Sequence, residues 1–378
     1  MDGLAARLDR TFETAIAERR IVGGVILVML DGELVYRRAA GLSDREEGRA
    51  MATDAIFRLA SITKPIVSAV IMRLVEQGIL DLDDSVTRWL PDFRPRLKDG
   101  TSPTISIRQL LTHTGGLSYR FLEQPSHAYH QLDISDGLDQ PGLSIADNLA
   151  RLARAPLAYP PGSSWRYSLS TDVLGAVAEA ATEMSLGALV EQFVTMPLSM
   201  KDTGFVVADR ARLVTPYADG SVEPVRMSDG ILVPLYDSRC SFAPSRILNN
   251  ATYQSGGAGM VGTASDIMTF LETIRIGGGP ILQAKTVASM MSDHVGPQAA
   301  TQGPGWGFGY GWSVLSDATI AKSPQAKGAI QWGGAYGHYW FVDPKNRLSV
   351  VQLTNTAFEG MAGAFPRQVR DAVYGVKT

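Results

Sequence analysis

Ser61 and Lys64, in the segment Ser61-Ile62-Thr63-Lys64, place a hydroxyl group three residues ahead of a primary amine. A serine hydroxyl is a weak nucleophile near neutral pH until an adjacent base removes its proton. Residues three apart share one face of a helix, so the Lys64 amine can reach the Ser61 oxygen. Of the eight lysines in the chain, this is the one that follows a serine at that spacing. The pair predicts a nucleophile with its own activating base, and the alternative is a solvated helix start.

The sequence around this pair favours the chemical interpretation. Pro65 to Met72 carries no charged residue and is apolar on nearly every helical face, which predicts a buried helix. Burial and the positive end of the helix dipole both disfavour a protonated amine at the helix start. We therefore expect the pKa of Lys64 to be lowered toward the range in which lysine acts as a base.

Two later segments can complete such a site. Tyr167 follows a tight Pro160-Pro161-Gly162 turn, and its phenol could relay a proton beside a cation such as Lys64. In the segment 331–338, Gly333 and Gly334 interrupt a β-prone run, as happens where a ligand or another backbone approaches closely. Such a strand could direct the Ala335 amide, together with the Ser61 amide, at a developing oxyanion. The alternatives are a core tyrosine and a glycine kink in a sheet.

The composition describes an ordinary folded chain and excludes several other functions. It has 378 residues, of which 45% are hydrophobic and 19% charged, and its formal net charge is −3. The sequence therefore lacks the excess of positive charge that binding to nucleic acid or to an anionic membrane requires. The single Cys240 excludes an internal disulfide, and the five histidines form no recognisable metal-ligand motif. The first residues lack the pattern of a secretory signal, and no apolar run is long enough to span a bilayer, so we expect a cytoplasmic protein.

The periodicity of the sequence predicts the elements that position these residues. An amphipathic helix is expected over 4–20, followed by a β-hairpin of 23–30 and 33–39 turning at Asp31-Gly32. Short helices are expected around 86–90, 106–111 and 147–153, late strands over 310–315, 330–333, 339–343 and 348–354, and a final helix over 365–376. This order predicts an α+β fold whose antiparallel sheet uses both chain ends. We assign 1–80 and 190–378 to the sheet domain and 81–189 to a mainly helical insertion, with the site between them.

The order Ser61-x-x-Lys64, Tyr167 and a glycine-rich late strand is similar to that of class C β-lactamases and penicillin-binding proteins. More closely, the chain resembles the family VIII carboxylesterases. The likeness spans almost the whole chain and includes segments 57–61, 110–114, 197–200, 306–310, 332–334 and 353–356. It implies a β-lactamase-like fold with flanking helices, Ser61 as nucleophile, Lys64 and Tyr167 as the base pair, and Ser61 and Ala335 as oxyanion donors. It implies no metal or organic cofactor and a small-molecule ester as the partner, and it leaves the oligomeric state open.

The differences from the β-lactamase pattern concern the substrate. Lactamases usually carry a cationic Lys-Thr-Gly or His-Thr-Gly at the position of Trp332, Gly333 and Gly334, and an asparagine at the position of Leu169. The earlier His113-Thr114-Gly115 precedes Tyr167 and is interpreted as a turn. Replacing polar anchors by apolar walls weakens binding of anionic amides, so neutral esters are expected as substrates.

We therefore predict a serine carboxylesterase for short-chain neutral esters, including acetyl esters carried by a cephalosporin nucleus. Trp332, Gly333, Gly334, Leu169 and Tyr119 are expected to contact the substrate, with Phe121, Tyr129 and Trp340 as further aromatic lining. A β-lactamase or D-amino-acid peptidase is the enzymatic alternative. An inactive penicillin-binding homologue is the non-enzymatic one.

Overall fold

The central element is an eight-stranded antiparallel sheet in the order β10-β11-β12-β13-β14-β1-β2-β3. The computed structural model describes residues 3–235 and 238–376. The strands of the sheet are β1 (Gly23–Leu30), β2 (Glu33–Asp44), β3 (Arg49–Ala50), β10 (Trp306–Phe308), β11 (Ser313–Leu315), β12 (Ile330–Gly334), β13 (His338–Asp343) and β14 (Leu348–Thr354). The pairing of β1 with β14 joins the two ends of the chain, which confirms the predicted sheet.

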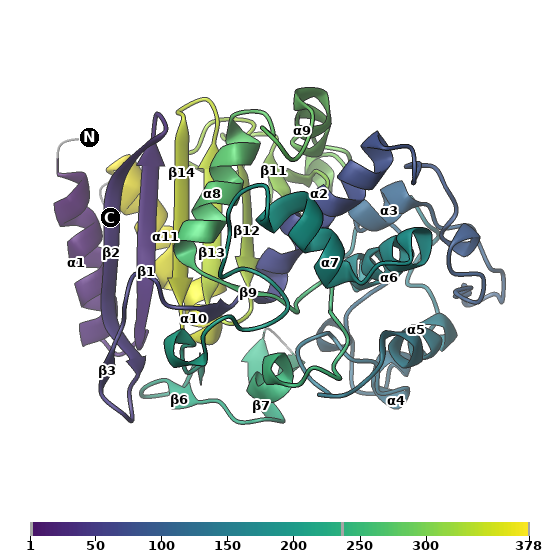
Figure 1. Cartoon of the computed structure of the whole chain (residues 1–378), viewed down its shortest axis with the longest axis horizontal. Helices are drawn as coiled ribbons and strands as arrows, with labels where there is room; N and C mark the ends of the chain where they lie inside the picture. The colour runs from purple at the N-terminus through teal and green to yellow at the C-terminus, as the bar shows by residue number, and fades with distance from the viewer. Residues whose placement is uncertain (1–2, 236–237, 377–378) are drawn as a thin grey trace.

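β1 shows why this sheet lies in the middle of the molecule. Val25 and Leu27 belong to the main hydrophobic core, whereas Ile26 and Val28 belong to a second core on the opposite face. Because successive strand residues point to opposite faces, β1 must be covered on both sides. Helix α8 (Ala264–Arg275) packs on β14 and β1 in front of the sheet, and α1 (Leu4–Ala17) and α11 (Ala364–Tyr374) pack together on the other face (Figure 1).

The remaining helices form the other half of the molecule, shown in blue and teal at the right of Figure 1. They are α2 (Thr63–Glu76), α3 (Ile107–Leu111), α4 (Ala128–Gln131), α5 (Ile145–Arg154), α6 (Ser170–Thr182) and α7 (Leu186–Val190), with α9 (Ala284–Met290) and α10 (Ala357–Ala362) beside the sheet. Helix α2 is buried along almost its whole length, as predicted, and it packs on α6 and α7. The proposed division at residues 80 and 190 stays a prediction. Residues 1–2 and 377–378 lie outside the described residues, and so does the start of the N-terminal segment that we expect not to be a secretory signal.

The structure also contains small two-stranded pairs that the sequence did not predict, and the pair at residues 57–58 and 261–262 joins segments far apart in the chain. The pairs are β4 (Phe57–Arg58) with β9 (Val261–Gly262), β5 (Tyr217–Ala218) with β6 (Val225–Arg226), and β7 (Ile231–Leu235) with β8 (Ser238–Phe242). The predicted strand over 310–315 begins only at Ser313. A Cβ on Gly311, whose φ is 109°, would lie 2.7 Å from the Ser68 Oγ, so the chain turns against α2 there.

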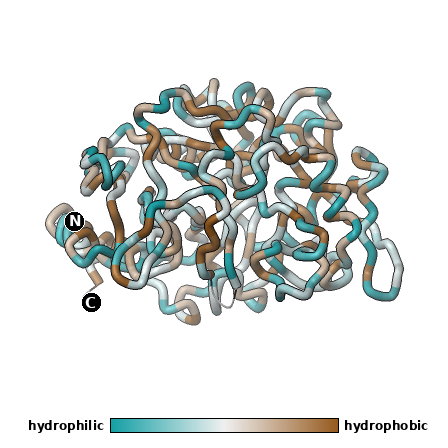
Figure 2. Tube along the Cα trace, turned by 90° about the horizontal axis from the view of Figure 1, so that it is seen from below, coloured by the Kyte–Doolittle hydropathy of each residue, from teal (hydrophilic) through white to brown (hydrophobic). Residues whose placement is uncertain are grey.

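In Figure 2, brown hydrophobic stretches run through the middle of the molecule and teal marks several loops at its rim. Among residues 3–235 and 238–376, no single helix is long and apolar enough to cross a membrane. Helix α6 and the helical stretch Leu186–Thr195 meet that criterion only as a pair bent by 88°. Residues Ser170–Ala178 of α6 are all buried inside the fold.

Candidate active site

Ser61 lies at a sharp change of direction between β4 and α2. A single 3₁₀ turn, Ala60–Ile62, joins the strand to the helix. Ala60, immediately ahead of the serine, has a φ of 46°, which an alanine adopts at a cost of roughly 1–3 kcal/mol. The surrounding structure therefore holds the backbone of Ala60 in a conformation that is unfavourable for this residue. This conformation leaves Ser61 partly exposed to a cavity while its neighbours Ala60 and Ile62 are buried.

The Ser61 hydroxyl is held by the two predicted partners. The Lys64 Nζ lies 3.3 Å from the Ser61 Oγ, and the Tyr167 phenol donates a hydrogen bond of 2.6 Å to the same oxygen. The Lys64 Nζ also lies 4.6 Å from the centre of the Tyr167 ring. Two side chains, one of them 106 residues away along the chain, thus converge on one hydroxyl.

The environment assigns different protonation states to the two partners. Burial lowers the pKa of Lys64 to about 7, although the charges of Asp172 and Asp136 act in the opposite direction. Burial raises the pKa of Tyr167, so its phenol keeps its proton at neutral pH. A neutral Lys64 amine can therefore accept the Ser61 proton, while Tyr167 is suited to donate rather than to act as a phenolate base.

The glycine-rich loop of residues 255–259 fixes the position of Lys64, and the sequence analysis did not predict this role. The amine donates a 2.8 Å hydrogen bond to the carbonyl oxygen of Gly257. Ser255, in the same loop, donates a 2.5 Å hydrogen bond to the buried carboxylate of Asp172. A Cβ on Gly257 would lie 2.3 Å from the other Asp172 oxygen, so only glycine permits this contact. Asp172 therefore holds the loop and also supplies the charge that acts most strongly to raise the pKa of Lys64.

His113 supports Tyr167 from behind. Its ring lies against that of Tyr167 with centroids 5.1 Å apart, and its Nδ1 is 3.0 Å from the Ser168 Oγ. Burial lowers its pKa well below the usual range, so the imidazole is neutral. The His-Thr-Gly segment is a turn, as predicted, and its histidine packs against the site instead of facing substrate.

The late strand β12 contributes one wall of the site. Trp332 packs edge-on against Tyr167, with ring centroids 5.2 Å apart. A Cβ on Gly334 would lie 2.4 Å from the Leu59 carbonyl oxygen, so this glycine brings β12 against the segment that carries Ser61. Ala335 follows directly and lines the same cavity as Ser61. Its amide is available as an oxyanion donor, because no hydrogen-bond acceptor for it occurs in the described part of the chain.

Ser61 opens into a cavity of about 430 Å³ with a mainly apolar wall. Of the predicted residues it contains Ser61, Tyr119, Phe121, Tyr167, Trp332, Gly333 and Ala335. Residues that the sequence analysis did not propose complete it: Leu122, Asp136, Leu138, Trp165, Arg166, Leu235, Cys240, Ala258, Thr301, Gln302, Tyr339, Phe358, Met361 and Ala362. The size and lining suit a small organic ligand.

Four predicted lining residues lie elsewhere, which corrects the sequence analysis. Leu169 is fully buried in the main core at the start of α6, because the chain turns inward directly after Tyr167. Gly334 faces the backbone at Leu59 rather than the cavity. Tyr129 accepts a hydrogen bond from the Ser118 amide inside the helical half, and Trp340 points into the core.

The two charged residues on the cavity wall are already engaged. Arg166 forms a 2.9 Å ion pair with Glu123. Asp136 accepts hydrogen bonds from the Arg120 and Phe121 amides, and burial raises its pKa to about 7. A ligand carboxylate would find no free cation here among the described residues. The same residues contain no group of three or more His, Cys, Asp or Glu side chains placed to hold a metal ion.

The β-lactamase family model matches residues 8–374. The chain belongs to this family. Among its relatives, Esterase EstB of Burkholderia gladioli is 53% identical over 98% of this chain and 95% of its own length. The solved structure of EstCE1, a hydrolase with promiscuous acyltransferase activity, is 48% identical, with a TM-score of 0.96 over 99% of both chains. A penicillin-binding protein homologue from Pyrococcus abyssi shares the fold, with 19% identity and a TM-score of 0.73 over 100% of this chain and 77% of its own.

Proposed function

We propose that this β-lactamase-family protein is a serine carboxylesterase of the family VIII type that hydrolyses short neutral esters through an acyl-enzyme. The observation that carries the proposal is the Ser61 hydroxyl, bonded by both Lys64 and Tyr167 at the mouth of an apolar cavity. The similarity to Esterase EstB and to the hydrolase EstCE1 over nearly the full chain supports the same activity.

In the proposed reaction, the Ser61 Oγ attacks the ester carbonyl carbon while the neutral Lys64 amine takes its proton. The Ser61 and Ala335 amides stabilise the oxyanion of the tetrahedral intermediate. As the carbon–oxygen bond to the alcohol breaks, Tyr167 donates its proton to the departing oxygen and regains one from the Lys64 ammonium. Water then attacks the acyl-enzyme by the same route, releasing the acid and restoring the Ser61 hydroxyl.

The cavity wall supports a preference for small, uncharged substrates. Trp332 stands where the resemblance to lactamases would place a cation, and its indole limits the room beside Tyr167. Phe358 and Met361 extend the apolar surface. We therefore expect acetyl to butyryl esters to react faster than long-chain esters. An acetyl ester on a cephalosporin nucleus fits the same proposal, because its carbonyl is an ordinary ester.

The test is a series of chromogenic esters of increasing acyl length beside a chromogenic cephalosporin. We expect kcat/KM for the short esters to exceed that for ring opening by about a thousandfold or more, roughly 4 kcal/mol of discrimination, as for the loss of two good polar contacts. Efficient ring opening with a pendant acetyl group left intact would instead support the β-lactamase or D-amino-acid peptidase alternative. Absence of turnover on both would support the inactive penicillin-binding homologue.

The proposal also includes a cytoplasmic location. Fractionation of cells that express the native gene, with the activity followed in each fraction, tests it. Activity recovered in an extracellular or membrane fraction would contradict it.

A further inference from the structure

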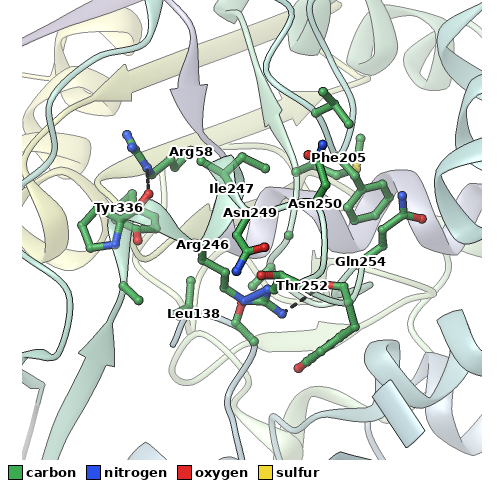
Figure 3. A pocket seen from close by; sticks show the side chains of 18 residues that line it. Arg58, Leu138, Phe205, Arg246, Ile247, Asn249, Asn250, Thr252, Gln254 and Tyr336 are labelled. Carbon is green, nitrogen blue, oxygen red and sulfur yellow. Dashed lines mark hydrogen bonds between the residues drawn. The ribbon is translucent and has the colours of Figure 1, made fainter. Parts of the chain in front are cut away.

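A second cavity of about 290 Å³ lies next to the candidate active site. Leu138 and Ala258 line both cavities, and Tyr336 in the second follows Ala335 in the first. In Figure 3, Arg246 lies at the centre of this cavity beside Asn249, with Arg58 and Tyr336 on one side and Phe205 and Gln254 on the other. The mechanism proposed above uses none of these side chains.

Arg246 is a buried cation bonded to backbone carbonyl groups. Its side chain is 8% exposed, and it donates hydrogen bonds of 3.0 Å to the Gly137 carbonyl and 3.1 Å to the Tyr253 carbonyl. Its guanidinium also lies 4.5 Å from the centre of the Tyr253 ring. Across the described residues, no carboxylate comes within 4.0 Å of it.

Arg58, on the same cavity, has the same kind of environment. It donates 2.9 Å hydrogen bonds to the carbonyls of Pro244 and Val214 and forms no ion pair in the described chain. Asp229 acts on Arg58 and Asp172 acts on Arg246 through longer-range charge interactions, but each is hydrogen-bonded to a serine, Ser245 and Ser255 respectively. The cavity thus combines a buried cation, Arg246, and a partly exposed cation, Arg58, and neither has a directly paired acid among the described residues.

Tyr336 adds an unpartnered donor. Its side chain is buried, with 5% exposure, and its hydroxyl has no hydrogen-bond partner among the residues that the structure describes. The charges of both Arg58 and Arg246 reach this phenol. The Tyr336 hydroxyl is not among the fully enclosed polar atoms, so it remains accessible from the cavity as a donor. A buried cation without an anion beside it, such as Arg246, is stabilised by an anion that pairs with it. The three side chains together make an incomplete anion site.

We propose that this cavity binds the carboxylate group of a small organic acid. A carboxylate accepts hydrogen bonds from guanidinium and phenol donors and balances the buried charge. Phe205, Ile247 and Met260 supply an apolar wall that would hold an alkyl group, which favours an organic acid over an inorganic ion. The acid is either a free product of ester hydrolysis or the distal carboxylate of a half-ester that extends past Leu138 from the first cavity.

Occupation of this site would act on the reaction through two short connections. Tyr336 is adjacent in sequence to Ala335, whose amide is the proposed oxyanion donor. Ala258 is adjacent to Gly257, whose carbonyl binds Lys64. The effect on catalysis rests on the proposed function, whereas the binding itself does not.

The test measures binding of butyrate by isothermal titration, with chloride at equal ionic strength and inorganic phosphate as comparison ions. We expect saturable butyrate binding that weakens at least about tenfold in Arg246→Met, since a charge-assisted pair is lost. Exposed Arg10 provides the matched control, and Arg10→Met should bind butyrate as the wild type does. Tyr336→Phe removes a single hydroxyl and should weaken binding at least about threefold, which keeps the test valid if Arg246→Met fails to fold.

Failure of butyrate to bind, or equal binding by the wild type and Tyr336→Phe, would overturn the proposal. Tight phosphate binding without butyrate binding would also overturn it. The source of the carboxylate follows from kinetics with monomethyl and dimethyl succinate. A half-ester preference that is lost in Arg246→Met indicates a substrate carboxylate, and non-competitive inhibition by butyrate that is lost in the same variant indicates the free acid. Because titration needs no turnover, its outcome is separable from failure of the esterase proposal.

Discussion

Replacing Asp172 by asparagine should move the pH dependence of catalysis without changing the reacting groups. Lys64 must be neutral to accept the Ser61 proton, and its pKa is lowered from 10.5 to about 7 by burial. With a pKa of 7, about 9% of the amine is neutral at pH 6 and about 91% at pH 8. We therefore expect kcat/KM to rise about tenfold between these pH values and then to level off. A lysine with its ordinary pKa would give a rate that still increases above pH 9.

The direction of the shift follows from the charge of Asp172. This carboxylate stabilises the Lys64 ammonium and is the largest influence opposing the effect of burial. Asp172→Asn keeps an oxygen to accept the hydrogen bond from Ser255 but removes the charge. The pKa of Lys64 should fall further, so the acid limb of kcat/KM moves to lower pH. The assay is pH-stat hydrolysis of a simple alkyl acetate from pH 5 to 9, because its leaving group does not titrate.

Asp136 requires a control, because burial raises its pKa to about 7 as well and the two groups titrate over the same range. In Asp136→Asn the limb should persist, displaced to lower pH, since Asp136 also favours the ammonium form. A limb that vanishes in Asp136→Asn, or one that moves to higher pH in Asp172→Asn, would refute the assignment of Lys64 as base.

Three further predictions test the remaining parts of the site. Lys64→Ala and Tyr167→Phe should each lower kcat by about 10²–10⁴. The double variant should be little worse, because the effects of substituting groups that act as one unit do not add. Near-normal turnover in Tyr167→Phe would contradict the proton relay. Gly334→Ala should lower kcat/KM because its methyl group would lie 2.4 Å from the Leu59 carbonyl oxygen. Gly333→Ala should have a smaller effect, because its methyl group meets mainly the flexible side chain of Met361 and lies 3.1 Å from the His338 carbonyl oxygen. Equal kinetics of the two variants would contradict this interpretation of β12. Trp332→Ala should shift the preference toward longer acyl chains while destabilising the fold by about 3–5 kcal/mol, measured with the ester series and by denaturant unfolding; an unchanged chain-length profile would show that the indole does not limit the acyl pocket.

The parts of the fold that could be predicted are those with a strong local pattern. The hairpin of β1 and β2 turns at Asp31-Gly32 as expected, and α1 begins at the predicted Leu4. Helix α2 was recognisable because its apolar residues leave no solvent-facing side. By contrast, two-residue strands such as β4 and β9 exist only through pairing between segments about 200 residues apart, so no periodicity signals them.

The site shows the same limit. The types and spacing of Ser61 and Lys64 indicated their chemistry, and Tyr167 reaches the serine as expected. Leu169 was placed by its distance from Tyr167 along the chain, but the start of α6 turns its side chain into the core. The contributions of Asp172 and Gly257 come from tertiary packing around a buried amine. A search for a buried acid near the predicted base could have suggested Asp172, whereas the backbone carbonyl of Gly257 has no sequence signal.

The most direct measurement of the central claim is the mass and position of a covalent adduct. A fluorophosphonate, which imitates the tetrahedral intermediate of ester hydrolysis, should add one label to the wild type and abolish esterase activity in proportion. Peptide mapping should place that label on Ser61, and Ser61→Ala should remain unlabelled, inactive and folded. Loss of activity with the label on another serine, or undiminished ester hydrolysis by Ser61→Ala, would contradict the account.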